Sequence, residues 1–373
     1  MYFVHPQIRI RELFLLLPCF FKPKKEIKGL VKMFPQKSIT FTDMGRTAFR
    51  LIIEELSLQG SEIIFPAFTC DIFIPIFQRY QIKPIFIDVD KETFNIKAGA
   101  IEQKITNKTK AIVMSHTYGL ACDIEKITKI AKKHNLKIIE DCSHALGGRY
   151  KERYLGNFSD AAFFSTYKLF PTLRGGIAIL SKEKTISLKK TSFSKRDLLS
   201  FLNCFSLFSF IFKTFFAKQA KQNIRKEKTI TLSAINRVSY NIFAFYFKNL
   251  NATIEKRRDV SIYFQNELKK IGFVTQPQNN NSFNFLSCLY MKNKNRDSFV
   301  YSIKKKRIFP TRIWHNPIIV NPKIKEGLTF YPNTIEVSKR IINFPLQSFY
   351  RKQDIDKITL SIKKVVQNKK NEI

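Results

Sequence analysis

The residues of this chain best suited to chemistry are an acid and a lysine that lie close together in the sequence. Asp141 ends the apolar run of "IIEDCSHALG", residues 138–147, and Lys168 lies in the apolar and aromatic stretch "FFSTYKLFPTLRGG", residues 163–176. A lysine becomes a covalent catalyst by forming a Schiff base when burial or neighbouring groups keep its amine neutral. Pyridoxal phosphate, the commonest cofactor bound in this way, needs an acid on its pyridinium nitrogen. Asp141 and Lys168 together therefore predict a pyridoxal-phosphate site.

The phosphate of such a cofactor needs a third element, and the stretch "MGRTAFRLIIEEL", residues 44–56, has a suitable form. A helix N-terminus with small residues presents backbone N–H groups and a favourable dipole to an anion. Gly45 permits close approach, Arg46 opens the helix, and the Thr47 hydroxyl adds a hydrogen bond. Ser165 offers a second hydroxyl near the lysine. Each feature alone is common, but their order along the chain makes the combination specific.

Strands and helices alternate from about residue 40 in the manner of an α/β protein. The strand "LKIIE", residues 136–140, places Asp141 at its carboxyl end, where open α/β sheets bind their ligands. Asp123 is a favourable cap for an amphipathic helix at 123–135. The other expected strands are 61–65, 83–89, 110–116, 161–165 and 176–181, and further helices are expected after Gly45 and at 71–80. We therefore expect a mostly parallel sheet with its ligand site at the carboxyl edge.

After about residue 250 the pattern predicts a small α+β domain. It consists of an amphipathic helix at 251–272, strands at 281–291 and 308–314, and a final helix after Asp354.

The segment 182–228 interrupts the α/β rhythm. It is rich in lysine and arginine and contains "LLSFLNCFSLFSFIFKTFF", residues 198–216, which is dense in Phe and Leu. Two interpretations stay open. The stretch forms a buried pair of helices, or it is an interfacial element that lays its aromatic face on an anionic membrane surface.

The composition bounds the class of protein. The chain has 373 residues, 44% of them hydrophobic, which suits one large domain plus a smaller one. Six cysteines without a C-x-x-C pair indicate free thiols in a reducing cytoplasm. The net charge of +36 permits anionic partners, but lysine is abundant throughout and no nucleic-acid-binding motif focuses the charge. The N-terminus, residues 1–39, lacks a signal-peptide cleavage site and a spanning apolar run, and predicts a folded or membrane-touching arm.

A series of landmarks along the chain resembles the DegT/StrS family of pyridoxal-phosphate-dependent sugar aminotransferases, also described as DegT/DnrJ-type. The landmarks are "GRTAF", "EIIFPAFTC", "PIFIDVD", "KAIVMSHTYG", "IIEDCSHALG", "LGNFSDAAFFSTYK", "LRGG", "IEKRRDVSIYF" and "INFPLQ". The resemblance implies a fold-type-I transferase that forms a homodimer with active sites at the subunit interface. Its large domain would occupy residues 40–250, with 182–228 as an insertion, and its small domain residues 251–373.

The resemblance also implies roles for individual residues. Lys168 would bind the cofactor covalently and carry protons, and Asp141 would pair with the pyridine nitrogen. His144 would lie beside the cofactor ring, although a satisfied core histidine would look the same. The phosphate would be held by Gly45, Arg46 and Ser165, with Asn236 as a candidate that reaches it from the partner subunit.

Three features depart from, or fit only loosely with, the family pattern. Ser165 and Lys168 are three residues apart, where the commonest form has five, although a shorter variant also occurs. Cys70 stands where many relatives carry an aromatic residue that stacks on the cofactor. His116 matches a landmark but could serve strand-end structure as easily as substrate contact.

By this resemblance the expected activity is transfer of an amino group, with glutamate as donor, to a nucleotide-linked keto-sugar for surface polysaccharide or glycan synthesis. No metal and no nucleic-acid partner are expected. A sugar dehydratase is an alternative, against which the presence of Lys168 speaks, because dehydratases of this kind replace the lysine with histidine. A second alternative is a catalytically weak scaffold that docks glycan assembly to the inner face of the membrane through residues 198–216.

Overall fold

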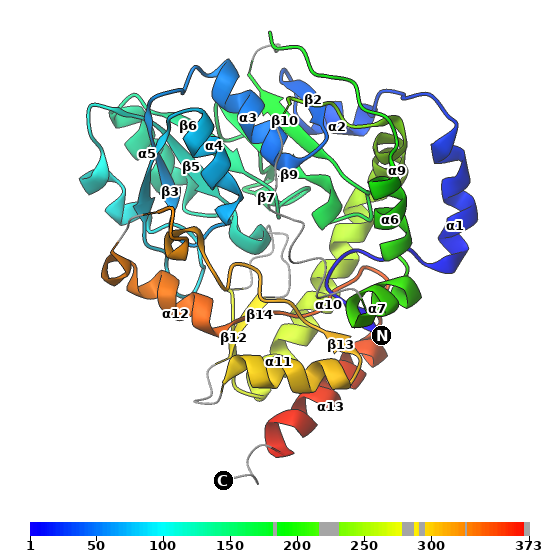
Figure 1. Ribbon diagram of the computed structural model, residues 1–373. Helices are drawn as coiled ribbons and strands as arrows, with labels where there is room; N and C mark the ends of the chain where they lie inside the picture. Colours follow the sequence, from blue (N-terminus) through cyan, green and yellow to red (C-terminus); the bar gives the residue numbers. More distant parts are fainter. Residues whose placement is uncertain (182–184, 216–230, 278–286, 291–294, 325–326, 369–373) are drawn as a thin grey trace.

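A seven-stranded sheet forms the centre of the computed structural model (Figure 1), which describes residues 1–181, 185–215, 231–277, 287–290, 295–324 and 327–368. The strands lie in the order β2-β10-β9-β6-β5-β3-β4. Five neighbouring strands, from β9 to β4, run parallel, whereas β10 runs antiparallel between β9 and β2. The bounds are β2 Ser38–Thr42, β3 Glu62–Pro66, β4 Lys83–Ile87, β5 Thr109–Ser115, β6 Lys137–Asp141, β9 Ala161–Ser165 and β10 Gly176–Leu180. The prediction of a mostly parallel sheet is confirmed.

Helices cover both faces of this sheet, and each face has its own apolar core. On one face lie α3 (Gly45–Glu55) and α4 (Ile74–Arg79), which bury side chains such as Phe49 and Phe77. On the other face lie α5 (Ile124–Lys133), α9 (Arg237–Phe247) and the start of α10 (Leu250–Lys270). Strands buried on both faces explain the nearly unbroken apolar runs of the sequence. As predicted, the Asp123 side chain caps α5, accepting a hydrogen bond from the backbone N–H of Lys126 at 3.1 Å.

A smaller antiparallel sheet follows, with the order β11-β12-β14. It packs with the far end of α10 and with α11 and α13 around a third core. The bounds are β11 Phe273–Thr275, β12 Ser287–Tyr290, β14 Ile341–Asn343, α11 Arg296–Lys305, α12 Pro332–Arg340 and α13 Lys352–Asn368. The strand expected at 281–291 is confirmed over β12, while 281–286 and 291 lie outside the described residues. The strand expected at 308–314 is wrong beyond β13 (Ile308–Phe309), because the next residues form a loop in which Trp314 has a φ of 60°.

The N-terminal arm packs against two parts of the chain, the small domain at β13 and the helices α6 (Lys195–Asn203) and α9. Its first strand, β1 (Tyr2–Phe3), pairs in parallel with β13. Its helices are α1 (Ile10–Leu16) and α2 (Lys28–Met33), joined in part by a short 3-10 helix at Leu17–Phe20. The Phe-rich stretch forms two helices, α6 and α7 (Ser206–Phe215). Helix α6 packs with α1 and α9 in a small fourth core, whereas Phe210 of α7 lies against Phe309 of β13 with ring centroids 6.1 Å apart. The expected pair of helices is therefore present, but only part of its apolar surface is buried. None of the described helices is long and apolar enough to cross a membrane.

A small hairpin and several short 3-10 helices complete the connections. The hairpin consists of β7 (Arg149–Tyr150) and β8 (Arg153–Tyr154). The 3-10 helices are η1 Leu17–Phe20, η2 Asp71–Phe73, η3 Ala98–Ala100, η4 Glu102–Lys104, η5 Thr117–Gly119, η6 Thr166–Lys168, η7 Ile318–Val320 and η8 Leu328–Phe330.

Candidate active site

The carboxyl ends of three adjacent parallel strands bring the predicted chemical groups to one edge of the sheet. Ser115, the last residue of β5, pairs in register with Asp141, the last residue of β6. Asp141 in turn pairs with Phe163 of β9, two residues before Ser165 ends that strand. The helical turn η6 then carries Lys168. The strand register therefore places Asp141 and Lys168 at the same edge, as the sequence predicts.

Lys168 and His144 are in direct contact. Lys168 Nζ lies 2.9 Å from His144 Nε2. Burial lowers the pKa of the His144 imidazole well below its usual range, and the nearby charge of Lys168 lowers it further. The ring is therefore neutral near pH 7 and can accept a hydrogen bond from the lysine or, in its other tautomer, donate one to it. The structure therefore places a neutral imidazole beside Lys168.

The loop that carries Lys168 is closed at its base. The backbone N–H of Thr166 donates to the carbonyl of Gly175 at 3.1 Å, and the Thr166 and Thr172 hydroxyls lie 2.8 Å apart. Arg174 of the same loop forms an ion pair with the buried carboxylate of Asp197 in α6. These contacts hold the lysine at a fixed distance from the strand that precedes it.

Asp141 is buried, and one of its carboxylate oxygens accepts a hydrogen bond from the backbone N–H of Ser143 at 3.0 Å. The charges of Lys168 and Asp141 both act on the thiol of Cys70, which follows β3. Burial is the largest cause of the raised pKa of the Cys70 thiol, so the thiol stays protonated near pH 7. Cys70 is therefore a small neutral side chain at the edge of the site.

The N-terminus of α3 meets the end of β9 without room for another atom. A Cβ on Gly45 would lie 2.3 Å from Ser165 Oγ and 3.2 Å from the carbonyl oxygen of Phe164. Arg46 follows in the first turn and acts electrostatically on Asp43 just before the helix. Only glycine allows this approach, so Gly45, Arg46 and Ser165 share one small region at a helix N-terminus.

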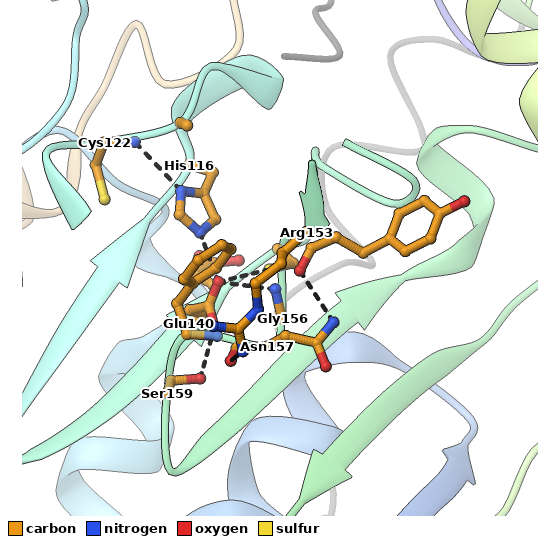
Figure 2. A network of polar contacts seen from close by, with 12 residues as sticks. His116, Cys122, Glu140, Arg153, Gly156, Asn157 and Ser159 are labelled. Atoms are coloured by element: carbon orange, nitrogen blue, oxygen red, sulfur yellow. Dashed lines mark hydrogen bonds and ion pairs between the residues drawn. The ribbon is translucent and has the colours of Figure 1, made fainter. Parts of the chain in front are cut away.

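Behind Asp141, a buried network fixes the strand ends (Figure 2). Glu140 accepts hydrogen bonds from His116 Nε2 at 3.0 Å, the Gly156 and Phe158 backbone N–H groups at 2.7 Å, and Ser159 Oγ at 2.8 Å. Burial alone would raise the pKa of Glu140, but the hydrogen bonds from His116, Gly156 and Ser159 together lower it. His116 Nδ1 accepts from the backbone N–H of Cys122 at 3.3 Å, so its proton lies on Nε2.

This network assigns His116 to strand-end structure. Ligand atoms of His116, Glu140 and Cys142 lie within 4.8 Å of one another, a spacing also found in metal sites. Four donors already occupy the Glu140 carboxylate, and burial raises the pKa of the Cys142 thiol well above its usual range. The hydrogen bonds explain the cluster without an ion. The sequence signal for this network was the pair of consecutive acids in "IIED". Consecutive side chains of a strand point to opposite faces of the sheet, so Glu140 and Asp141 could not both lie on the same face.

An aromatic cluster beside His144 was not predicted from the sequence. The ring centroids of Tyr118 and Trp314 lie 5.4 and 5.2 Å from that of His144. Tyr118 and Trp314 stack with centroids 5.3 Å apart, and the Tyr118 hydroxyl donates to the Ile313 carbonyl at 2.7 Å. The small domain thereby contributes a ring to the site through a loop whose tryptophan has an unusual positive φ.

Asn236 is the one predicted site residue that the structure places in a different immediate role. It caps α9, its Oδ1 accepting from the backbone N–H of Ser239 at 2.8 Å. Its Nδ2 is buried and has no hydrogen-bond partner among the described residues. Asn236 therefore uses its side-chain oxygen to cap α9, and its side-chain nitrogen takes no part in the cap.

These residues fit pyridoxal phosphate. The Gly45–Ser165 approach brings a hydroxyl group to a helix N-terminus, where hydroxyl and backbone N–H donors are of the types that bind phosphate. A buried carboxylate and an amine in contact with a neutral imidazole supply the other two requirements of that cofactor.

The chain is similar to known proteins in sequence and in fold. The chain is 25% identical over 327 residues to dTDP-3-amino-3,6-dideoxy-alpha-D-galactopyranose transaminase from Aneurinibacillus thermoaerophilus, covering 85% of this chain and 83% of that one. It is 40% identical over 150 residues to GDP-perosamine synthase from Escherichia coli O157:H7, where the alignment spans 39% of this chain and 41% of that protein. The structure of PseC from Helicobacter pylori, an aminotransferase involved in the biosynthesis of pseudoaminic acid, has the same fold, with a TM-score of 0.76 at 18% identity over 98% of this chain and 99% of that one.

The sequence profile of the DegT/DnrJ/EryC1/StrS aminotransferase family matches residues 36–363, nearly the whole chain. The predicted fold type and cofactor are confirmed together with the family. The chain belongs to the DegT/DnrJ/EryC1/StrS family of pyridoxal-phosphate-dependent sugar aminotransferases.

Proposed function

We propose that this protein transfers the amino group of an amino acid, glutamate, to a keto-sugar linked to a nucleotide, for the synthesis of a surface polysaccharide or glycan. The observation that carries the proposal is the contact of Lys168 with His144 beside the buried carboxylate of Asp141. The names of two relatives, a GDP-perosamine synthase and a dTDP-aminosugar transaminase, support the nucleotide-sugar substrate. The presence of a lysine rather than a histidine at position 168 favours transamination over dehydration.

Each residue has a defined task in this reaction. Pyridoxal phosphate, when bound, withdraws electrons from the carbon atom that gains or loses the amino group. Lys168 holds the cofactor and moves a proton to or from that carbon through Nζ. Asp141 keeps a proton on the pyridine nitrogen by its negative charge. His144, neutral and buried, orients Nζ of the lysine through their contact.

Gly45, Arg46 and Ser165 bind the phosphate at the N-terminus of α3. Asn236, the candidate for a phosphate contact from the partner subunit of a homodimer, has its Nδ2 buried within its own chain, so we do not assign it that contact. Trp314 and Tyr118 flank His144 and exclude water from that side of the site.

We also propose the division of the chain into the arm at 1–39, the large domain at 40–250 and the small domain at 251–373. The separate sheets and cores support it. A cytoplasmic location, with contact at the inner face of the membrane, completes the proposal. The six cysteines, all free, suit a reducing compartment.

The test is a coupled assay with purified protein, pyridoxal phosphate, glutamate and a panel of GDP- and dTDP-linked keto-sugars. We expect an aminated nucleotide sugar by mass spectrometry and 2-oxoglutarate in equal amount. Lys168→Ala should lose turnover and the visible absorption of the covalently held cofactor, whereas Lys151→Ala, which changes an exposed lysine of the β7–β8 hairpin, should retain both.

Borohydride reduction followed by peptide mapping should place the cofactor on Lys168. A dehydrated sugar in place of an aminated one would favour the dehydratase. Turnover by Lys168→Ala at the parent rate would refute the assignment of the lysine.

A further inference from the structure

The arm and the Phe-rich insertion jointly expose a set of large apolar side chains. On α1 and the turn after it, the side chains point outward along one face and belong to Ile10, Phe14, Leu15, Leu17 and Phe21. Within these twelve positions, four Phe and Leu residues and one Ile are exposed. A large contiguous apolar patch on a soluble protein marks a surface that contacts something.

The helices α6 and α7 extend this face. Their exposed apolar side chains are Leu198, Leu199, Leu207, Phe208 and Ile211. We call these five, together with the five of the arm, the apolar face.

The two parts of the apolar face are held together by the folded chain. Phe20 of the arm packs edge-on against Phe201 of α6, and the backbone N–H of Ile8 donates to the Cys204 carbonyl at 2.8 Å. The ring of His5 reaches the Ser209 hydroxyl of α7 at 2.9 Å. In Figure 1 the three helices α1, α6 and α7 lie on the same side of the molecule. These contacts hold the two parts of the apolar face near each other, although they belong to segments almost 200 residues apart.

Exposed cations adjoin the apolar face at both ends. Arg11 and Lys22 flank the arm residues, and Lys195 and Arg196 directly precede those of α6. The nearby acids are mostly occupied, because Glu12 is paired with Arg9 and the buried Asp197 with Arg174, leaving Glu26 exposed. Apolar side chains beside unbalanced cations form the pattern of interfacial helices on anionic bilayers.

We propose that the apolar face docks this protein on an anionic membrane surface, with α1 and α7 at the headgroup boundary. A second copy of the chain fits less well. A two-fold contact places the same patch on both subunits, so the cations around each copy would face those of the other. The net charge of +36 adds to the attraction of anionic lipid. The inference does not depend on the proposed reaction, since it uses none of the site residues.

The experiment is flotation of the purified full-length protein with vesicles of phosphatidylglycerol and phosphatidylethanolamine, at low and high salt, with phosphatidylcholine vesicles in parallel. We expect flotation with the anionic vesicles at low salt and at least tenfold less with phosphatidylcholine or at high salt. The double variant Phe14→Ser, Phe208→Ser should bind the anionic vesicles at least tenfold more weakly.

Phe330→Ser is the matched control for the apolar change, because Phe330 is 72% exposed and Phe14 is 73% exposed. The variant Arg11→Glu, Lys195→Glu, Arg196→Glu tests the cations, with Lys110→Glu, Lys129→Glu, Lys132→Glu as a control of equal charge on exposed positions elsewhere. Circular dichroism and the molar mass in solution are measured for every variant.

Three outcomes would overturn the proposal. The parent could remain at the bottom of the gradient with anionic vesicles at low salt. The variants of the apolar face could float as well as their controls. The double variant could change its molar mass in solution, in which case the apolar face is an interface between subunits.

Discussion

At the scale of single residues, Asp141 is the group whose charge the site needs most. We expect Asp141→Asn to lower turnover by roughly a hundredfold or more, because removing one preorganised electrostatic partner has effects of that size. The amide can still accept the hydrogen bond from Ser143, so the strand end should keep its shape. Steady-state kinetics with the best sugar substrate is the measurement, and cofactor content is the control. Undiminished turnover would transfer the role to another acid.

His144 gives the protein a predictable response to acid. Its folded pKa lies well below the value of about 6.5 that it has in an unfolded chain. The unfolded state therefore binds more protons in the window below pH 6.5, and the contribution of His144 to stability is complete above that pH and falls as the pH drops.

We expect the parent to lose about 1 kcal/mol more than His144→Gln between pH 7.5 and 5.5, since a one-unit excursion below the unfolded pKa costs about 1.4 kcal/mol. Urea unfolding of both proteins without cofactor at the two pH values measures the difference, and other titrating groups cancel in the comparison. An equal loss in both proteins would mean that His144 has the same pKa in the folded and unfolded states.

The sequence reveals some of these residues and hides others, for a physical reason. Lys168, Asp141 and His144 lie within a short segment, so residue types and spacing are enough to associate them. Trp314 reaches His144 from a loop about 170 positions later in the chain, and no local pattern encodes a contact of that range. The stretch Ile308–Trp314 was predicted as a strand because it is rich in β-branched and aromatic residues, which occur in strands and in packed loops alike.

At the scale of elements, the ion pair of Arg174 and Asp197 joins the loop of Lys168 to α6. The Asp197 side chain is almost fully buried and also accepts hydrogen bonds from the backbone N–H and hydroxyl of Ser194 at 2.8 and 2.7 Å. We expect Arg174→Ala to destabilise the protein by about 2–3 kcal/mol, because it leaves a buried carboxylate without its cation.

Thermal or urea unfolding measures that change. Lys133→Ala, which breaks an exposed ion pair with Glu102, is the control and should unfold like the parent. Equal unfolding of Arg174→Ala and the parent would show that Ser194 alone satisfies Asp197.

The elements around the sheet were more predictable than those outside it. β9, β10 and α5 follow from continuous apolar runs and a capping residue, which are local signals. The short strand β1 has no such signal, because two residues form a strand only when a partner such as β13 is already in place. The division of α6 and α7 into buried and exposed faces depends on the arm, which the sequence places almost 200 residues away.

At the scale of the whole molecule, the net charge of +36 should affect the rate of substrate capture. The nucleoside diphosphate of such a substrate is anionic, so the electrostatic field of the protein accelerates its approach. Salt screens that field over about 10 Å at 0.1 M. We expect kcat/KM for the nucleotide sugar to fall several-fold between about 50 and 300 mM KCl, with kcat nearly unchanged. The same titration with sodium chloride in place of potassium chloride is the control for an effect specific to the potassium ion. A kcat/KM independent of salt would mean that local contacts alone govern binding.

The pairing of β1 with β13 also has a consequence for biosynthesis. Tyr2 and Phe3 leave the ribosome long before Ile308 and Phe309, and the carbonyls of Phe3 and His5 wait still longer for the Gln347 side chain that donates to them at 2.9 Å. At a synthesis rate of about 5–20 residues per second, the delay is roughly 15 to 60 s. During that time the arm has no place to fold, and the side chains of α1 are available to any passing chaperone or lipid surface. The arm can therefore contact a chaperone or a lipid surface before the rest of the chain has been synthesised.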